Sequence, residues 1–325
     1  MDTWDVVVVG AGVCGLTIAH TLSEQGRSVV LLDKGSRPGG RLASRPLGGV
    51  LMNTSVDTVR VRDVGVMHEI SRRTGATFTP TPVLPAGVES PVLPAGDSTW
   101  VLDRPTGQVA ALWAAGTTVQ HTYVTHIEMP GSGVFHVRPH GTGDPILAAA
   151  VVVTAPVPQS REILLHSAIP IRADLANVAY EQRIMLLCVV DGPEPDETVL
   201  DESKMIDLIR LRHREENGLV WLELFATALW SSTMFLQDST FTHSAMLVEL
   251  RRLYPGARVM NSQLKQWRYA NPRRSVTDAT FEQSTKHPGI YVAGDGFGPV
   301  FGHPSGVENA VRSGLDVSRA LLLPR

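Results

Sequence analysis

The sequence is poor in cysteine, with only Cys14 and Cys188 among its 325 residues. It contains no Cys-x-x-Cys pair, which excludes a redox dithiol and a zinc knuckle. The eleven histidines are scattered and form no His-x-x-x-His pair on a predicted helix, so no metal site is expected. We expect both thiols to be buried, and a reducing cytoplasm is the expected location of such a chain.

The chain also has little net charge and no long apolar run. Its formal net charge is −3, too small for a strong attraction to nucleic acid or an anionic membrane. No apolar stretch approaches the length of a membrane span, and no basic segment precedes the first apolar run, unlike in a secretory signal. We therefore expect a soluble globular protein whose partner is a small molecule. The sequence leaves the oligomeric state open.

Glycine, in contrast, is abundant and is placed informatively near the N-terminus. Residues 6–9 are a continuous run of valine, which is typical of a strand covered on both faces. Gly10 permits a tight turn, Gly12 lets the backbone approach a pyrophosphate, and Gly15 lets the following helix pack closely on the strand. Asp33 ends a second apolar strand and is placed to accept hydrogen bonds from a ribose diol, which disfavours a 2′-phosphate. This pattern predicts a dinucleotide site, whose lining also includes Val13, Cys14 and Lys34.

Two later segments extend this site. Gly39-Gly40-Arg41 is a flexible cationic turn, and Arg41 is suited to donate to a pyrophosphate. A buried strand over 148–153 ends at Thr154, and another over 290–293 ends at Gly294-Asp295. Strand ends of this kind commonly face the nucleotide in such sheets.

The order of patterns predicts an α/β fold with two domains. A Rossmann-like, dinucleotide-binding domain is expected over 1–60, 97–160 and 275–325. A substrate domain built on a mixed sheet is expected over 61–96 and 161–274. Residues 79–99, rich in Pro, Gly and Thr, predict a loop or hairpin. The main further elements expected are helices over 64–76, 239–253 and 305–323, and strands over 117–127, 133–138, 183–190 and 218–226.

The chain resembles flavoproteins of the amine-oxidase and glutathione-reductase type, and is most similar to their renalase-like branch. Three phrases carry the resemblance besides the glycine turn. They are GGRLASR at 39–45, QWRYANP at 266–272, and GDGFGP at 294–299 running into SGVE at 305–308.

This resemblance implies FAD as the bound cofactor. It places Asp295 at the ribityl chain, and the backbone of Gly306 and Val307, at a helix N-terminus, at the pyrimidine edge of the flavin. Reduced flavin carries negative charge at that edge, which a helix N-terminus stabilises. The resemblance also implies that Val124 contacts adenine. The implied activity is two-electron oxidation of a small molecule, a dihydronicotinamide isomer or a cyclic amine, with O2 reoxidising the flavin.

The chain departs from the renalase-like pattern after the GGR turn. Where such proteins usually carry Asp-His-Gly-Ala-Gln-Tyr, this one has Asn53-Thr54-Ser55-Val56-Asp57-Thr58. A flavin-dependent oxidase or desaturase of a specialised metabolite is therefore an alternative, as is a flavin protein without net redox turnover.

Four residues are candidates for contact with the substrate or the flavin ring. Asn53 is a candidate for a polar contact. Asp57 is either a base, an anchor for a cationic substrate, or a structural carboxylate. Trp267 is either a wall of the flavin pocket or a packed core residue. His303 either contacts substrate and handles protons, or is a solvated loop residue.

Overall fold

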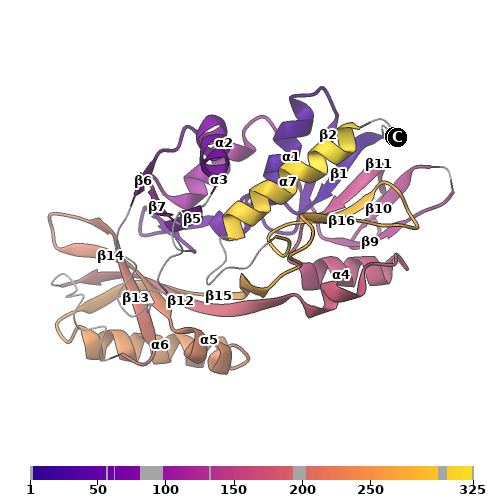
Figure 1. Ribbon diagram of the computed structural model, residues 1–325. Coiled ribbons are helices and arrows are strands. Elements are labelled where there is room, and N and C mark those ends of the chain that lie inside the picture. Colours follow the sequence, from indigo (N-terminus) through magenta and orange to yellow (C-terminus); the bar gives the residue numbers. More distant parts are fainter. Residues whose placement is uncertain are drawn as a thin grey trace.

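The computed structural model describes residues 3–55, 58–61, 63–80, 98–131, 133–192, 203–298 and 306–323 (Figure 1). The expected loop or hairpin over 79–99 lies largely outside these ranges. Within them, no helix is long and apolar enough to cross a membrane.

The first sheet is built on five parallel strands. Their order is β8 (Thr118–His121), β2 (Val29–Asp33), β1 (Trp4–Val9), β11 (Ile146–Val153) and β17 (Ile290–Ala293). Three antiparallel strands complete it: β16 (Phe281–Gln283) pairs with β17, β10 (Phe135–Pro139) with β11, and β9 (Val124–Glu128) with β10. We call this sheet the Rossmann sheet.

Both faces of the Rossmann sheet are covered. Because side chains alternate along each strand, neighbouring residues enter different cores. Val6 and Val8 face a core formed with α1 (Val13–Ser23), α2 (Val64–Thr74), α3 (Thr106–Ala114) and α7 (Gly306–Leu322). Val7 and Val9 face a second core formed with β9, β10, α4 (Val157–His166) and the short 3₁₀ helix η2 (Ala173–Asn177). Figure 1 shows α7 lying beside α1 on one side of the sheet and α4 on the other. The valine run therefore forms the centre of the domain.

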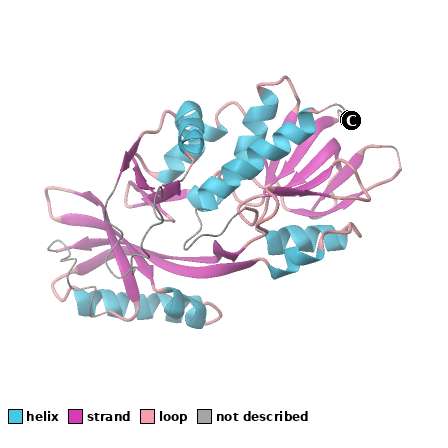
Figure 2. Cartoon of the chain, viewed as in Figure 1, coloured by secondary structure: helices cyan, strands magenta, loops and turns pink. Residues whose placement is uncertain are grey.

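The second sheet is antiparallel, in the order β13 (Ile206–Arg214), β14 (Leu219–Ala226), β12 (Ala179–Asp191) and β15 (Arg258–Arg274). One face packs on α5 (Ala228–Met234) and α6 (Ser239–Leu253), through Met246 and Leu250 among others. The opposite face packs on the hairpin of β3 (Ser44–Leu47) and β4 (Val50–Asn53), through Leu47 and Met52. Figure 2 shows the long strands β12 and β15 extending from this sheet toward the Rossmann domain.

Smaller elements lie between the two sheets. The 3₁₀ turn η1 (Gly40–Leu42) precedes the β3–β4 hairpin. Strands β5 (Thr58–Val61), β7 (Ser98–Leu102) and β6 (Phe78–Pro80) form a three-stranded antiparallel sheet.

The predicted fold class is confirmed: a Rossmann-like domain carries a second, smaller sheet. The domain division differs from the expected one in two places. Helix α2, expected in the substrate domain, packs in the first core through Val66 and Ile70. Residues 161–178 were also expected there, but Leu164 and Leu175 pack on the Rossmann sheet. Both segments have apolar faces, and their sequences do not show which sheet buries them.

Three local differences separate the predicted elements from the observed ones, and two of them have clear causes. The strand expected over 117–127 is two strands, because β8 pairs with β2 and the chain then turns into β9. The β3–β4 hairpin and helix α3 were not predicted. Helix α3 has no acidic residue in its first turn and no side-chain cap of its own, so its sequence gives no start signal.

Candidate functional site

The turn after β1 exposes backbone N–H groups at the start of α1. Gly10 has φ of 114°, which favours glycine, and a Cβ on Gly15 would lie 2.0 Å from the carbonyl oxygen of Gly10. These two glycines therefore permit the close turn. A Cβ on Gly12 would meet no atom within 4 Å, and no side chain caps this end of α1. The first N–H groups of the helix thus remain available to an anion.

Asp33, at the end of β2, fixes the same turn. Its Oδ2 accepts a hydrogen bond from the backbone N–H of Ala11 at 2.6 Å, and its Oδ1 accepts one from Gly35 at 2.6 Å. A carboxylate has about four acceptor positions, so further hydrogen bonds are open to it. The residue lines the cavity described below.

The second glycine turn packs directly on the first. The N–H of Gly39 donates to the carbonyl of Ala11 at 2.7 Å, and a Cβ on Gly40 would lie 3.3 Å from the Cα of Gly12. Gly39 has φ of 107° and leaves no room for a Cβ against Ala110. Two segments about thirty residues apart in sequence therefore form one continuous backbone surface.

Arg41 links the Rossmann domain to β15. Its Nη1 lies 2.6 Å from Oδ2 of Asp295 and donates to the carbonyl of Ala270 at 2.8 Å. The Tyr180 hydroxyl donates to Oδ1 of Asp295 at 3.0 Å. Burial, and then the Asp295 carboxylate, raises the pKa of Tyr180 well above its usual value, so the phenol stays protonated. The structure therefore adds to the predicted pyrophosphate contact of Arg41 an ion pair with Asp295 and a hydrogen bond to the second sheet, neither of which was predicted.

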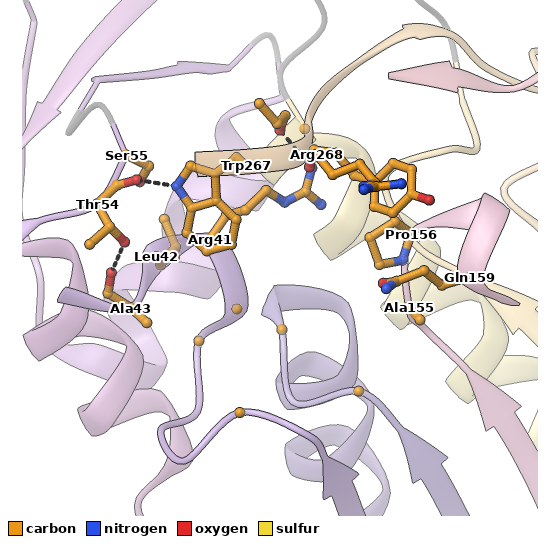
Figure 3. A pocket seen from close by; sticks show the side chains of 18 of the residues that line it. Arg41, Leu42, Ala43, Thr54, Ser55, Ala155, Pro156, Gln159, Trp267 and Arg268 are labelled. Carbon is orange, nitrogen blue, oxygen red and sulfur yellow. Dashed lines mark hydrogen bonds between the residues drawn. The ribbon is translucent and has the colours of Figure 1, made fainter. Parts of the chain in front are cut away.

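The second sheet forms the opposite wall. Trp267 on β15 donates from Nε1 to the carbonyl of Thr54 at 2.5 Å, as Figure 3 shows. The Nζ of Lys265, two residues earlier on the same strand, lies 3.8 Å from the centre of the Trp267 ring. Burial, together with the positive charge of Arg45, lowers the pKa of Lys265 to about 8. These contacts with Thr54 and Lys265 fix the orientation of the Trp267 ring. This geometry fits its expected place at a pocket wall.

These parts surround one cavity of about 1950 Å³. Most of the predicted residues line it: Gly10, Gly12, Val13, Cys14, Asp33, Lys34, Gly40, Arg41, Val124, Thr154, Trp267, Gly294, Asp295, Gly306 and Val307. Gly15 lies behind the turn instead and acts through helix packing. Asp57 and His303 fall outside the described residues.

The prediction for Asn53 is wrong. Its side chain is fully buried away from the cavity. The Oδ1 atom accepts hydrogen bonds from the backbone N–H of Thr106 at 3.0 Å and from the Ser44 hydroxyl at 3.2 Å. Asn53 therefore anchors the first turn of α3, a partnership across 53 residues that local sequence does not indicate.

Both cysteine predictions are confirmed, since Cys14 and Cys188 are free and buried. Burial raises the pKa of each thiol well above its usual value, so neither is a reactive thiolate. In the described part of the chain, no three His, Cys, Asp or Glu side chains group together as a metal site would require.

Several cavity residues of the second sheet were missed. Arg183 forms ion pairs with Glu181 at 2.8 Å and with Asp207 at 2.9 Å. Burial raises the pKa of Asp207, although the charge of Arg183 opposes this shift. Strand alternation indicated that these residues share a face with their neighbours. It did not indicate which face looks onto the cavity.

Comparison with known proteins finds sequence matches for the N-terminal part of the chain. Residues 8–68 match the family model described as an NAD(P)-binding Rossmann-like domain. The hydroxyneurosporene desaturase of Rubrivivax gelatinosus is 37% identical over 77 residues. That match covers 24% of this chain and 14% of the desaturase, so the two are compared over a small part of the desaturase only.

Solved structures match nearly the whole chain. Wild-type putrescine oxidase bound to putrescine has a TM-score of 0.66 at 13% identity, covering 99% of each chain. A CLA-producing fatty acid isomerase from P. acnes has a TM-score of 0.66 at 13% identity, covering 97% of this chain and 98% of the isomerase. At these identities the likeness establishes the fold, which is shared by proteins with different reactions.

Proposed function

We propose that this chain is an FAD-dependent oxidoreductase that carries out two-electron oxidation of a small molecule. The observation that carries the proposal is the single cavity lined by both glycine turns, by Asp33 and Asp295, and by the second sheet. In such a cavity, the surface suited to bind a dinucleotide faces a separate wall that can contact a substrate. The amine-oxidase type resemblance and the shared fold of putrescine oxidase support the same function.

The residues present fit FAD. The open face of Gly12 and the uncapped start of α1 suit a pyrophosphate, and Asp33 suits a ribose. Val124 would contact adenine, and the backbone of Gly306 and Val307 at the start of α7 would meet the pyrimidine edge. The cavity of about 1950 Å³ exceeds the roughly 300–1,000 Å³ of a usual ligand site, which leaves room for a second molecule.

Bound FAD would supply the two-electron acceptor, so the protein's contribution is mainly to bind and orient the substrate. The hydrogen bond from Trp267 to Thr54 holds the indole at the cavity wall. Tyr180 and Arg41 hold Asp295 at the junction of the two domains. Asp57 and His303 remain proposed substrate contacts.

The substrate class follows from the renalase-like resemblance, which is itself part of this proposal. It favours a dihydronicotinamide isomer or a cyclic amine, with O2 as the acceptor. The desaturase relative favours a second candidate, the desaturation or oxidation of a specialised metabolite. The third candidate is a flavin protein without net redox turnover, which the shared fold of the fatty acid isomerase supports.

The test is an absorbance spectrum of the purified protein, followed by anaerobic titration with amines and dihydronicotinamide isomers. Released flavin is identified as FAD by chromatography after heat denaturation. Bleaching by a substrate with rapid recovery in air supports an oxidase, and slow recovery favours a dehydrogenase or desaturase. Unchanged flavin colour with every substrate, while product isomers appear, favours the non-redox candidate. A protein that takes up no FAD would refute the proposal.

A further inference from the structure

The second sheet presents an ordered row of side chains to the cavity. The register pairs Lys265 with Met185, Met185 with Phe225, and Phe225 with Leu208. All four residues line the cavity. The row therefore runs from a cation on β15, across β12 and β14, to an aliphatic side chain on β13.

The Lys265 ammonium, at one end of this row, has no carboxylate partner among the described residues. No carboxylate there forms an ion pair with Lys265, and Arg45 is the nearby charge that perturbs it. The two carboxylates of the neighbouring row, Glu181 and Asp207, both pair with Arg183. Because Lys265, Arg45 and Arg268 also line the cavity, basic side chains outnumber these two carboxylates on this wall.

The rest of the row is apolar and buried. Met185 is fully buried, and Phe225 and Leu208 are exposed by only 3% and 7%. An aromatic face is added by Trp267, over which the Lys265 ammonium lies. The three apolar side chains of the row are packed under the β3–β4 hairpin, so the groups that this wall offers a ligand are the Lys265 ammonium and the Trp267 ring, which suit an anionic head and an apolar body.

We propose that the substrate pocket selects an organic acid, with Lys265 as the counter-ion of its carboxylate and the Trp267 ring as the contact surface for its apolar body. The inference rests on the proposed FAD-dependent oxidation, and it favours an acidic substrate for that same cavity over the cyclic amine that the resemblance implies. It makes Lys265 a specificity-determining residue.

The test compares three probes with the same apolar body: 4-phenylbutanoate, 4-phenylbutanamide and 4-phenylbutylamine. Binding is measured by calorimetry at constant ionic strength, both on FAD-loaded and on FAD-free protein. At pH 6.5 the acid should bind about tenfold more tightly than the amide, which corresponds to about 1.4 kcal/mol. The amine should bind most weakly, because it meets a like charge.

Acid binding should weaken about tenfold as the pH rises from 6.5 to 9.5, because Lys265 has a pKa of about 8 and loses its proton in this range. The other charged groups lining the cavity around it are Arg45, Arg183, Glu181, Asp207 and Arg268. Among these groups, burial raises the pKa of the Asp207 carboxyl, which pairs with Arg183.

Two variants separate the role of Lys265 from a structural one. Lys265→Met should lower acid affinity about tenfold and abolish its pH dependence. Lys265→Arg should keep the affinity for the acid and also abolish the pH dependence below pH 9.5. Lys286→Met makes the same chemical change at an exposed site outside the cavity and should change neither.

The inference is overturned if the amine binds as tightly as the acid, if no acid binds, or if Lys265→Met leaves acid binding unchanged. These outcomes are distinct from failure of the proposed function, which would appear as absence of FAD. Loss of flavin would leave the acid titration of the FAD-free protein readable.

Discussion

Gly12→Ala should weaken FAD binding about tenfold while leaving the fold intact. The added methyl group would meet no protein atom within 4 Å, and Gly12 has φ of −79°, which alanine also adopts. The methyl group would instead project into the space that a pyrophosphate must enter to reach the first N–H groups of α1. The matched variant Gly15→Ala places its methyl group 2.0 Å from the Gly10 carbonyl oxygen and so strains the protein itself.

Gly12→Ala should change mainly the free energy of FAD binding, and Gly15→Ala mainly the free energy of unfolding. For Gly12→Ala, the unfolding free energy of the FAD-free protein should fall by at most about 1 kcal/mol, the usual range for alanine at a helix N-cap. For Gly15→Ala it should fall by about 1–3 kcal/mol, the usual cost of overpacking. FAD at 100 times its Kd stabilises a protein by about 2.7 kcal/mol. A tenfold loss of affinity in Gly12→Ala would reduce this to about 1.4 kcal/mol.

The assay is urea unfolding of each variant with and without a fixed FAD concentration, combined with FAD titration by flavin fluorescence. Gly12→Ala should lose about half of the FAD-dependent stabilisation, and Gly15→Ala should lose about 1–3 kcal/mol of the stability that does not depend on FAD. If Gly12→Ala bound FAD as tightly as the parent protein, the pyrophosphate would not lie on this turn. The cofactor assignment would then lose its main structural support.

Three further predictions test other parts of the site. Asp33→Ala should weaken FAD binding about ten- to a hundredfold in the same titration, since hydrogen bonds to a charged acceptor contribute roughly 1.5–3 kcal/mol; unchanged affinity would exclude the ribose contact. Glu223→Gln should lower the unfolding free energy by about 1–3 kcal/mol in urea, because the buried Glu223 carboxylate pairs with Arg212 and accepts from the Asn53 N–H; no change would mean that this pair contributes nothing to stability. Lys265, with its pKa lowered from 10.5 to about 8, is neutral in the folded state but protonated in the unfolded state between these values. It should therefore make stability rise with pH across this window, and Lys265→Met should remove that rise in a pH series of thermal unfolding; an identical pH profile for both proteins would contradict the lowered value.

Local sequence was sufficient to identify most residues that line the proposed cofactor side of the cavity. The contacts that matter there are between near neighbours, as in the turn of Gly10, Gly12 and Gly15, or arise from a repeated strand-to-turn pattern, as at Asp33 and Asp295. A glycine in a tight turn and an acidic residue at a strand end each serve a narrow set of structural roles. Each could therefore be interpreted before its neighbours were known.

The substrate side required the three-dimensional structure. Asn53 looked like a flavin contact by its position after the second glycine turn, but its side chain anchors α3 instead. Lys265 and Met185 are separated by eighty residues and become neighbours only through strand pairing. Alternation along a strand shows which side chains share a face, but not whether that face meets helices or a cavity.

The amino-acid sequence alone thus determined the Rossmann-like class, the two glycine turns and the residues suited to a dinucleotide, because these depend on backbone geometry that particular residue types permit. Only the tertiary structure decided which face of the second sheet completes the cavity, that Arg41 pairs with Asp295, and that Lys265 stands beside an apolar row. Those features depend on contacts between segments far apart in the chain, whose pairing is fixed by the packing of whole sheets rather than by any local pattern.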